Sequence, residues 1–432
     1  MRAAIIGGGP AGLIQAYALQ TLGIPYVIFE RNADFGGLWN RDDPASPIYD
    51  SAHLISSRTM TGFAGYPMPD DWPDYPSAAH ILQYIRDFAR KFDLYEHTFF
   101  GENVESAVPV TGGWRLKTST GRDEVFGWVI AANGSNWQPI IPNWPGQFKG
   151  RLRHGASFKN ANEVTGKRVL VVGLGNSGVD IASDVSRTAA SVHVSLRRGY
   201  HVVPKHILGK PADVFADETP PLPFWIRRKL SQILLRFLNG DLGRYGMPKP
   251  DHKLLETHPL LNDQFVHHLS HGDVAILGDI QRFDGDLITF KDGTSREFDE
   301  VICATGFEWE VPYVDPSLLP WERGRLAPPL AIFPEVENFF LLSFVESNGS
   351  SFSLFNDMSW IIGRAILAAR SDPAEYQRLR RVVVDTRFDV TNGLKMQDTD
   401  RHVGYMDNPT YRRALKKLRK IMGWPKSEAG QA

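Results

Sequence analysis

Two short apolar runs, each followed by glycines and then by apolar residues at helical spacing, dominate the hydrophobic pattern of this chain. Residues 1–6 run into the glycine-rich stretch 7–12, and apolar residues recur with a period near 3.6 directly afterwards. Residues 168–172 lead in the same way into a second glycine-rich stretch, 173–178. The pattern therefore predicts two strand–turn–helix units that lie far apart in the chain.

The chain between and beyond these units carries further periodic segments. The elements that they predict are a helix at 78–92, meander strands at 104–108, 114–118 and 124–131, a hairpin turn at 290–293, a strand at 300–303, a helix at 358–369 and a polar helical segment from 373 onward. The apolar face of the first of these helices consists of Ile81, Tyr84, Ile85 and Phe88. We expect the strand at 300–303 to return to the sheet of the first unit.

Residues 220–240 are both apolar and basic. The apolar side chains that share one helical face are Trp225, Ile226, Leu230, Ile233, Leu234, Phe237 and Leu238, whereas Arg227, Arg228, Lys229 and Arg236 lie elsewhere. A basic amphipathic helix rests on a membrane, lines a substrate channel or packs against a neighbouring domain. Packing is the commonest of these and is our expectation.

Composition narrows the class of protein. The length of 432 residues favours two domains, and 48 basic against 49 acidic residues give no electrostatic case for nucleic acid or an anionic membrane. The single cysteine, Cys303, excludes an internal disulfide and favours a reducing compartment. With no run of about 18 apolar residues and no room for a signal peptide, we expect a cytoplasmic protein without a membrane span. The histidines show no metal-ligand spacing, so we predict no metal site.

Each glycine of the first turn has a separate task in binding a dinucleotide. Gly7 permits the tight turn, Gly9 lets the backbone approach the phosphates, and Gly12 allows close packing of the helix. The helix N-terminus, where Pro10 is well suited, supplies oriented N–H groups to a pyrophosphate. The next strand ends on Glu30, which is placed to accept hydrogen bonds from a ribose 2'-hydroxyl. The first turn therefore indicates an FAD site.

The second turn differs from the first at the strand that follows it. The strand at 191–196 ends on Arg197 and Arg198 and not on an acid. An acid would repel the 2'-phosphate of NADP, whereas a guanidinium binds that phosphate through two parallel hydrogen bonds. The second turn thus indicates an NADPH site, with a solvated arginine pair as the alternative. One glycine triplet is weak evidence, since roughly 0.15 would arise by chance, but two with strand and helix flanks are strong.

Several further motifs point to one enzyme family. The stretch Phe148-x-Gly150-x3-His154-x3-Phe158 fits the identifying sequence of that family in full. Other segments that stand where the family has them are Gly36-Gly37-Leu38-Trp39, Gly173-Leu174-Gly175-Asn176-Ser177-Gly178, Asp292-Gly293 and Ala304-Thr305-Gly306-Phe307. On these residues, the chain from Ala3 to about Ala368 resembles the flavin-containing monooxygenases, class B flavoprotein monooxygenases that also resemble the Baeyer–Villiger enzymes.

The resemblance implies an α/β fold with two Rossmann-like dinucleotide-binding domains, the NADPH domain being inserted in the FAD domain. The expected limits are 1–162 for the first part of the FAD domain, 163–300 for the NADPH domain with a helical insertion near 200–260, and 301–432 for the second FAD part with C-terminal helices. The residues expected to bind FAD are Gly7, Gly8, Gly9, Pro10, Ala11, Gly12, Glu30, Arg31, Gly37, Leu38, Trp39, Val104, Thr305 and Gly306. Those expected to bind NADP are Gly173, Gly175, Asn176, Ser177, Gly178, Arg197 and Arg198.

For the reaction, the resemblance implies that NADPH reduces the flavin and that oxygen then forms a C4a-(hydro)peroxyflavin, which retained NADP shields. Many family members carry an asparagine six residues after Tyr49, where this chain has Ile55. We therefore expect Ser56 or Ser57 to act near the flavin as catalytic residues in its place. His154 is expected at the domain junction, where it positions the domains and transfers no proton.

The function that we expect is FAD-dependent, NADPH-using oxygenation of soft sulfur or nitrogen atoms in small apolar molecules, with molecular oxygen as co-substrate. Baeyer–Villiger oxidation of ketones is one alternative. An NADPH oxidase or a redox-sensing nucleotide-binding protein is another, which Ile55 keeps open. We expect no nucleic-acid partner, and a homodimer is considered.

Overall fold

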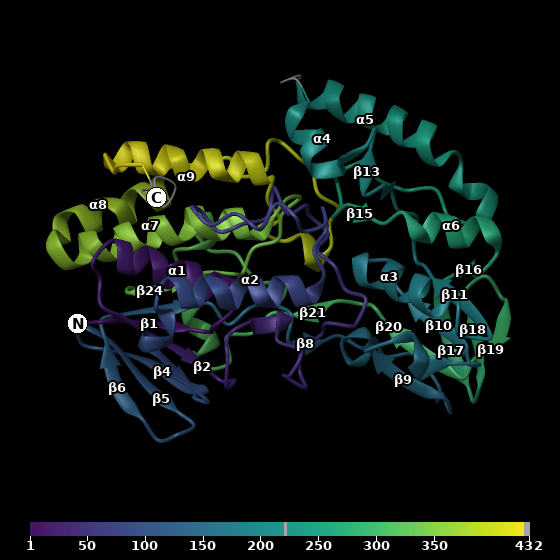
Figure 1. Cartoon of the computed structure of the whole chain (residues 1–432), viewed down its shortest axis with the longest axis horizontal. Coiled ribbons are helices and arrows are strands. Elements are labelled where there is room, and N and C mark those ends of the chain that lie inside the picture. Colours follow the sequence, from purple (N-terminus) through teal and green to yellow (C-terminus); the bar gives the residue numbers. More distant parts are fainter. Residues whose placement is uncertain (220–222, 427–432) are drawn as a thin grey trace. The chain divides into compact units, whose positions relative to one another are not determined.

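The computed structural model describes residues 1–219 and 223–426, and it divides into two compact units (Figure 1). The first unit contains residues 1–46, 58–135 and the chain from Trp309 onward. The second contains residues 136–308 and also the short segment 47–57. The expected limits of the cofactor domains near residues 162 and 300 remain predictions, because a compact unit does not show which nucleotide it binds.

The first unit is built on five parallel strands in the order β24-β7-β1-β2-β3. Their bounds are β1 (Ala3–Ile6), β2 (Tyr26–Glu30), β3 (Thr98–Phe100), β7 (Trp128–Ala131) and β24 (Phe339–Leu341). The strands β1, β2, β7 and β24 are buried along their whole length, which explains why they are apolar without alternation. Helix α1 (Pro10–Thr21) joins β1 to β2.

An antiparallel meander and a group of helices cover this sheet. The meander consists of β4 (Val104–Val110), β5 (Gly113–Thr118) and β6 (Asp123–Phe126). Ala4 and Ile6 of β1 belong to one apolar cluster with Trp114 and Phe126 of the meander. On the helical side, α1 contacts α7 (Ser351–Ser371), which contacts α8 (Pro373–Asp385) and α9 (Asn408–Met422). The predicted helix at 78–92 is α2 (Ala78–Lys91), and its predicted apolar face is buried.

The second unit repeats this plan with other residues. Its five parallel strands have the order β16-β11-β10-β20-β9. Their bounds are β9 (Arg151–His154), β10 (Arg168–Val172), β11 (Ser191–Ser195), β16 (Val274–Leu277) and β20 (Glu300–Cys303), and α3 (Asn176–Val185) joins β10 to β11. A second antiparallel meander, β17 (Ile280–Asp284), β18 (Leu287–Phe290) and β19 (Ser295–Glu297), shares an apolar cluster with this sheet. The predicted α/β class with two Rossmann-like units is therefore confirmed.

Two predictions of strand pairing are wrong. The strand at 300–303 forms as predicted, but it is β20 of the second sheet, where Val301 and Cys303 pair with Leu170 and Val172 of β10. A short buried strand can complete either sheet, and its sequence does not say which. The strand predicted at 124–131 splits at Gly127: β6 stays in the meander, whereas β7 joins the parallel sheet.

The remainder of the second unit is mainly the insertion between β11 and β16. Its elements are β12 (Val202–Val203), β13 (His206–Ile207), β14 (Lys210–Pro211), α4 (Ala212–Glu218), α5 (Phe224–Asn239), β15 (Leu260–Leu261) and α6 (Gln264–His271). The first residues of the basic amphipathic segment, 220–222, lie outside the described residues. Other short strands are β8 (Gln138–Pro139), β21 (Phe307–Glu308), β22 (Trp321–Glu322) and β23 (Arg325–Leu326). Among residues 1–219 and 223–426, no helix combines the length and apolarity that crossing a membrane requires.

Candidate functional site

The first glycine turn has the geometry that a bound pyrophosphate needs. Gly7 adopts a φ of +113°, which side chains rarely allow. A Cβ atom on Gly12 would lie 1.9 Å from the Gly7 carbonyl oxygen, so only glycine lets α1 begin this close to β1. Gly9 caps α1, and among the described residues there is no side-chain cap hydrogen bond at this helix N-terminus. The first N–H groups of α1 are therefore oriented toward a ligand anion.

Glu30 lies at the end of β2, beside the first glycine turn, where a ribose contact is predicted. Its Oε2 accepts a hydrogen bond from the Gly8 N–H at 2.7 Å, and its Oε1 accepts one from the Asn32 N–H at 2.8 Å. Burial raises the pKa of Glu30, and these two N–H groups oppose part of that shift. Each carboxylate oxygen keeps a second lone pair for a hydroxyl. The position at the end of β2, beside β1, is the one predicted for a ribose contact.

The Gly36-Gly37 pair packs directly on the first turn. The Gly36 N–H donates to the Gly8 carbonyl at 3.2 Å. A Cβ on Gly37 would lie 2.9 Å from the Gly9 Cα, so the two backbones touch at a point where any side chain would intrude. The structure thus brings Gly37 to the first turn, as predicted, and half-buried Leu38 and Trp39 follow it in a 3-10 turn.

Two other residues predicted to bind FAD have different surroundings. Arg31 pairs with Asp43 at 2.8 Å. The Val104 side chain is buried in the core between the sheet and its meander, so a contact of this residue with FAD would come from its backbone and stays a prediction. The backbone just before Val104 lies near the ribose side of the first glycine turn, because the Glu102 N–H donates to the Glu30 carbonyl at 3.1 Å.

The second glycine turn reproduces the first. Gly173 has a φ of +96°, and a Cβ on Gly178 would lie 2.3 Å from the Gly173 carbonyl oxygen. Gly175 caps α3 without any side-chain hydrogen bond, and a Cβ placed on it would meet open space within 4 Å. That space next to free helix N–H groups fits a second pyrophosphate. The Asn176 side chain is already used, since its Oδ1 accepts the Leu261 N–H at 3.0 Å.

The two predicted arginines follow β11 on the same sheet edge as this turn. Val172, the last residue of β10, pairs with Ser195, the last residue of β11. Arg197 comes two residues later and is exposed, and the Arg198 guanidinium lies 5.8 Å from the centre of the Tyr200 ring. The structure therefore places both arginines where a strand neighbouring the turn ends, which is where a ribose 2'-substituent is read.

On the other flank of each turn, a strand ends in an Ala-x-Gly sequence. β7 continues into Ala132-Asn133-Gly134, and β20 continues into Ala304-Thr305-Gly306. A Cβ on Gly7 would lie 2.5 Å from the Ala132 carbonyl oxygen, and one on Gly173 would lie 2.8 Å from the Ala304 carbonyl oxygen. The two segments are structural counterparts. Thr305 and Gly306, predicted to contact FAD, thus lie beside the second turn.

Segment 47–57 is attached to α3 by two carboxylates. The Tyr49 hydroxyl donates to Asp180 Oδ2 at 2.8 Å, and the Ser51 hydroxyl donates to Asp184 one helical turn later. Burial raises the pKa of Asp180, and the Tyr49 hydroxyl is the strongest group that opposes this shift. The Asn262 amide donates to the other Asp180 oxygen at 2.7 Å. Asp180 therefore has a donor on each carboxylate oxygen.

The predicted catalytic serines stand at the end of this segment. Ser57 is fully buried, and its N–H donates to Asp213 Oδ2 at 2.6 Å, so the insertion holds its backbone through α4. Ser56 and Ile55 are half-buried. The structure brings all three into the second unit with the second glycine turn, and a position next to the flavin stays a prediction.

The family-identifying stretch forms the edge of the second sheet. A Cβ on Gly150 would lie 2.4 Å from the Asp299 carbonyl oxygen, so glycine is required there. The Phe148 ring packs on Phe283 at a centroid distance of 5.5 Å, and Phe158 is fully buried. Each of these residues has a packing role, and His154 alone combines burial with an open hydrogen-bonding atom.

His154 ends β9 in register with Cys303. Its Nδ1 accepts the Ala156 N–H at 3.0 Å, and its ring lies edge-on to Phe307 at 4.9 Å. Its Nε2 is buried without a hydrogen-bond partner in the described part of the chain. Burial lowers the pKa of His154, which keeps the ring neutral at physiological pH, although the Gly306 backbone opposes part of the shift. A neutral histidine ring at this edge of the second sheet is better suited to holding neighbouring groups in position than to transferring a proton.

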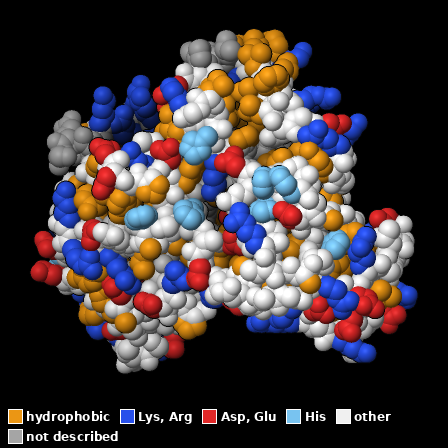
Figure 2. Space-filling view, turned by 45° about the vertical axis from the view of Figure 1, so that its right-hand side comes forward, with side chains coloured by type: hydrophobic (Ala, Val, Ile, Leu, Met, Phe, Trp, Pro, Cys, Tyr) orange, Lys and Arg blue, Asp and Glu red, His pale blue; other side chains and the backbone are white. Residues whose placement is uncertain are grey.

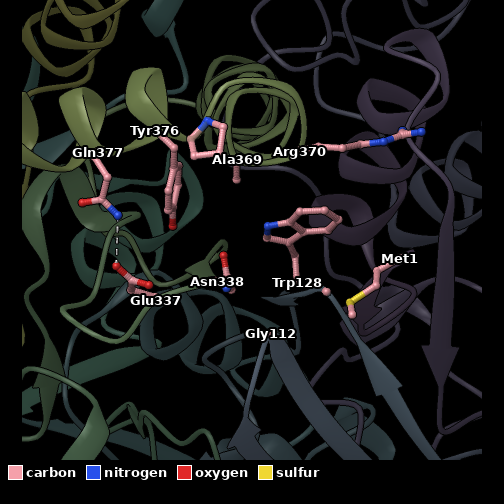
Figure 3. Close-up of a pocket in the computed structure, with 11 residues that line it drawn as sticks. Met1, Gly112, Trp128, Glu337, Asn338, Ala369, Arg370, Tyr376 and Gln377 are labelled. Carbon is pink, nitrogen blue, oxygen red and sulfur yellow. Dashed lines mark hydrogen bonds between the residues drawn. The ribbon is translucent and has the colours of Figure 1, made fainter.

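A cavity of about 330 Å³ lies in the first unit, away from the glycine turn (Figure 3). Met1, Trp128 and Asn338 line it at the amino ends of β1, β7 and β24, whereas nucleotides bind at the carboxyl ends of such strands. In Figure 3 the Trp128 indole and the Tyr376 ring lie on opposite sides of this space. We therefore do not assign the nucleotide site to it.

Sequence reasoning missed Asn133, Asp180 and Asp184. A signal was available for each. Ala132-Asn133-Gly134 repeats the pattern of Ala304-Thr305-Gly306 after an apolar strand, and two acids four residues apart after a glycine turn share one helix face. The hydrogen-bond partners of Asp180 and Asp184 are Tyr49 and Ser51, which lie more than a hundred residues earlier. No local sequence pattern links these partners to α3.

Two parallel sheets with a dinucleotide turn at the carboxyl edge of each define the class of two-nucleotide oxidoreductases. The family described as flavin-binding monooxygenase-like matches residues 1–391. A flavin-containing monooxygenase 5 from Homo sapiens is 34% identical over 346 residues, which cover 73% of this chain and 64% of that protein. The chain therefore belongs to the flavin-binding monooxygenase-like family, although its match spans less than two thirds of that relative.

Further relatives extend the comparison. Dimethylaniline monooxygenase (N-oxide-forming) 2 from Mus musculus is 31% identical over 431 residues, which cover 93% of this chain and 80% of that protein. A probable indole-3-pyruvate monooxygenase, YUCCA9, from Arabidopsis thaliana is 31% identical and covers 71% of this chain and 75% of that protein.

Solved structures share the fold. A flavin-containing monooxygenase from Stenotrophomonas maltophilia has a TM-score of 0.68 at 22% identity, over 86% of this chain and 99% of that one. Cyclohexanone monooxygenase has a TM-score of 0.70 at 19% identity, over 98% and 96%. FAD and NADPH are the cofactors of this family. The two uncapped helix N-termini and the glycine positions that a Cβ would fill fit both groups.

Proposed function

We propose that this protein is an NADPH-dependent flavin monooxygenase that transfers one oxygen atom to a soft sulfur or nitrogen atom of a small apolar molecule. The observation that carries the proposal is the pair of near-identical glycine turns, one followed by Glu30 and the other by Arg197 and Arg198. The Mus musculus relative is named for N-oxide formation, which favours a nitrogen or sulfur atom as the acceptor.

The residues would divide the work between the two nucleotides. Gly7 to Gly12 and Gly37 would hold the FAD pyrophosphate, and Glu30 would accept hydrogen bonds from its ribose. Gly173 to Gly178 would hold NADPH, with the 2'-phosphate on Arg197 and Arg198. By the internal repeat, Asn133 and Gly134 would border the FAD, while Thr305 and Gly306, predicted to contact FAD, lie beside the second glycine turn.

When bound, NADPH would supply the reducing hydride and the flavin would supply the chemistry that activates dioxygen. The chain contributes position and dryness, because a soft nucleophile needs no general base. His154 would hold the carboxyl edge of the second sheet next to Phe307. Ser56 and Ser57 would replace the asparagine that many family members carry, with Ser57 held in place by Asp213.

A carbonyl substrate is the second candidate. The Arabidopsis thaliana relative is named for indole-3-pyruvate, a keto acid, and cyclohexanone monooxygenase shares the fold. Reaction at a carbonyl carbon requires a deprotonated oxidant and inserts oxygen beside that carbon.

Product analysis with two substrates separates these proposals. The holoenzyme is incubated with NADPH and either a methyl aryl thioether or a cyclic ketone, and products are separated by gas chromatography. We expect the sulfoxide from the thioether and no lactone from the ketone. Lactone as the main product would favour the carbonyl candidate, and hydrogen peroxide equal to the NADPH consumed with both would indicate an NADPH oxidase.

A further inference from the structure

Helix α5 exposes an apolar face to solvent. The exposed fractions of its large apolar side chains are 85% for Phe237, 66% for Trp225, 59% for Ile233, 52% for Leu230 and 40% for Leu238. Figure 2 shows hydrophobic side chains gathered at the top of the molecule with Lys and Arg side chains beside them. Leu230, Ile233 and Phe237 are neighbours on one side of the helix. A group of exposed apolar side chains marks an interaction site, whereas single exposed apolar residues need no explanation.

The opposite side of α5 is anchored to its own unit. Leu235 is its only buried residue, and Arg228 pairs with Glu256 at 3.1 Å. At 100° per residue, Leu235 and Arg228 point in nearly the same direction, whereas Ile233 and Phe237 point away from them. The anchored side therefore fixes the helix so that its apolar stripe faces outward.

Cations flank the apolar stripe on both sides. In the same projection, Lys229 and Arg236 lie between Ile233 and Trp225, and Arg227 lies between Leu230 and Leu238. The stripe that the cations border therefore consists of Leu230, Ile233 and Phe237. The 16 residues of α5 contain no Asp or Glu. Whole-chain charge balance gave no case for an anionic surface, but it hides this local excess of cations.

We propose that α5 binds the surface of an anionic lipid bilayer, with its apolar stripe between the acyl chains and its flanking cations at the head groups. Apolar side chains in the middle and cations at the borders are the arrangement of an interfacial helix. A second copy of the chain is a poorer occupant, because face-to-face pairing would bring two cationic helices together without an acid between them. Such docking would place an enzyme for apolar substrates where those substrates partition.

Co-sedimentation of the holoenzyme with vesicles tests the proposal. Binding is expected to vesicles of phosphatidylcholine with phosphatidylserine, to fall with added salt, and to be weak with phosphatidylcholine alone. Lys229→Gln with Arg236→Gln should lower the partition coefficient roughly fivefold for each cation removed. Ile233→Asp with Phe237→Asp should abolish binding. Val108→Asp, at an equally exposed valine of the first unit, is the matched control and should bind normally.

A fluorescent label distinguishes the other occupants of this face. Cys303 is buried, so Phe237→Cys offers the accessible thiol for an environment-sensitive dye. A blue shift on adding anionic vesicles supports the proposal. It is overturned if the double aspartate variant binds vesicles normally, if the new thiol is unreactive without lipid because the chain itself covers α5, or if Phe237→Asp only converts a dimer to a monomer.

Discussion

The Tyr49 hydroxyl donates a hydrogen bond of 2.8 Å to Asp180, which joins residues far apart in the chain. It attaches segment 47–57, with Ile55, Ser56 and Ser57, to the helix that follows the second glycine turn. This contact with a partly buried carboxylate is one of several that hold the segment, among them Ser51 to Asp184 and the Ser57 N–H to Asp213.

Loss of this hydroxyl should make stability more sensitive to pH. Burial raises the pKa of Asp180 above its ordinary value of 3.8, so the folded protein keeps this proton to a higher pH than the unfolded chain. The free energy of unfolding therefore falls as pH rises from about 3.8 through the folded-state pKa. Tyr49→Phe removes a donor that limits the rise, and it should cost about 1.5 to 3 kcal/mol at neutral pH and less near pH 5.

The matched control for this variant is Tyr26→Phe. The Tyr26 hydroxyl donates to the neutral Gln20 side chain at 2.8 Å, so its loss should not depend on pH. Urea unfolding of both variants near pH 5 and near neutral pH makes the comparison. An equal loss for Tyr49→Phe at the two pH values would show that the charge of Asp180 is not involved.

Gly175→Ala should separate nucleotide binding from folding. A methyl group at Gly175 meets open space in the protein, whereas one at Gly178 would lie 2.3 Å from a carbonyl oxygen. We expect Gly175→Ala to keep its FAD absorbance and thermal midpoint while the KM for NADPH rises at least tenfold, because the methyl group occupies pyrophosphate space. Gly178→Ala should fail to fold. An unchanged KM in Gly175→Ala would place NADPH elsewhere.

Arg197→Ala should change the preference between the two nicotinamide cofactors. A charge-assisted hydrogen bond to the 2'-phosphate contributes about 1.5 to 3 kcal/mol, so the KM for NADPH should rise roughly 10- to 100-fold. The KM for NADH should stay nearly constant because NADH lacks that phosphate. Arg282→Ala, at an exposed arginine of the neighbouring meander, is the control. Equal effects on both cofactors would remove the proposed role.

Ile55→Asn should improve the coupling of NADPH consumption to product. The substitution restores a polar side chain at the position where many family members have one, and one buried hydrogen bond is worth about 1 to 3 kcal/mol. We expect the ratio of hydrogen peroxide to NADPH consumed to fall with a thioether present. Ile141→Asn, on an exposed loop of the same unit, should leave the ratio unchanged. If both variants give the same ratio of hydrogen peroxide to NADPH, a residue other than the one at position 55 determines the coupling.

The elements nearest the glycine turns could be predicted from the sequence because their signals are local. Gly7 to Gly12 and Glu30 lie within one strand–turn–helix–strand unit, and the same holds for Gly173 to Arg197. The face of α2 was predictable for a similar reason, since one amphipathic period defines it.

The sequence alone could not predict which distant segments of the chain pair or pack with one another. The prediction for residues 300–303 names the wrong sheet because short buried parallel strands look alike in sequence, and only the register with β10 shows where this strand pairs. Val104 was expected at FAD; its side chain packs in the core between the sheet and the meander, and its contact with FAD stays a prediction. The membership of Ser57 in the second unit depends on Asp213, which lies 156 residues later in the chain.

The activity that we propose for this protein is transfer of an oxygen atom from dioxygen to a soft heteroatom. Isotopically labelled dioxygen, NADPH and a methyl aryl thioether test it in one reaction, followed by mass spectrometry of the product and assays of NADPH and peroxide. We predict that the product is a sulfoxide carrying the oxygen label. Its amount should nearly equal the amount of NADPH consumed. Peroxide equal to NADPH, with no labelled product from any thioether or amine tried, would contradict the account.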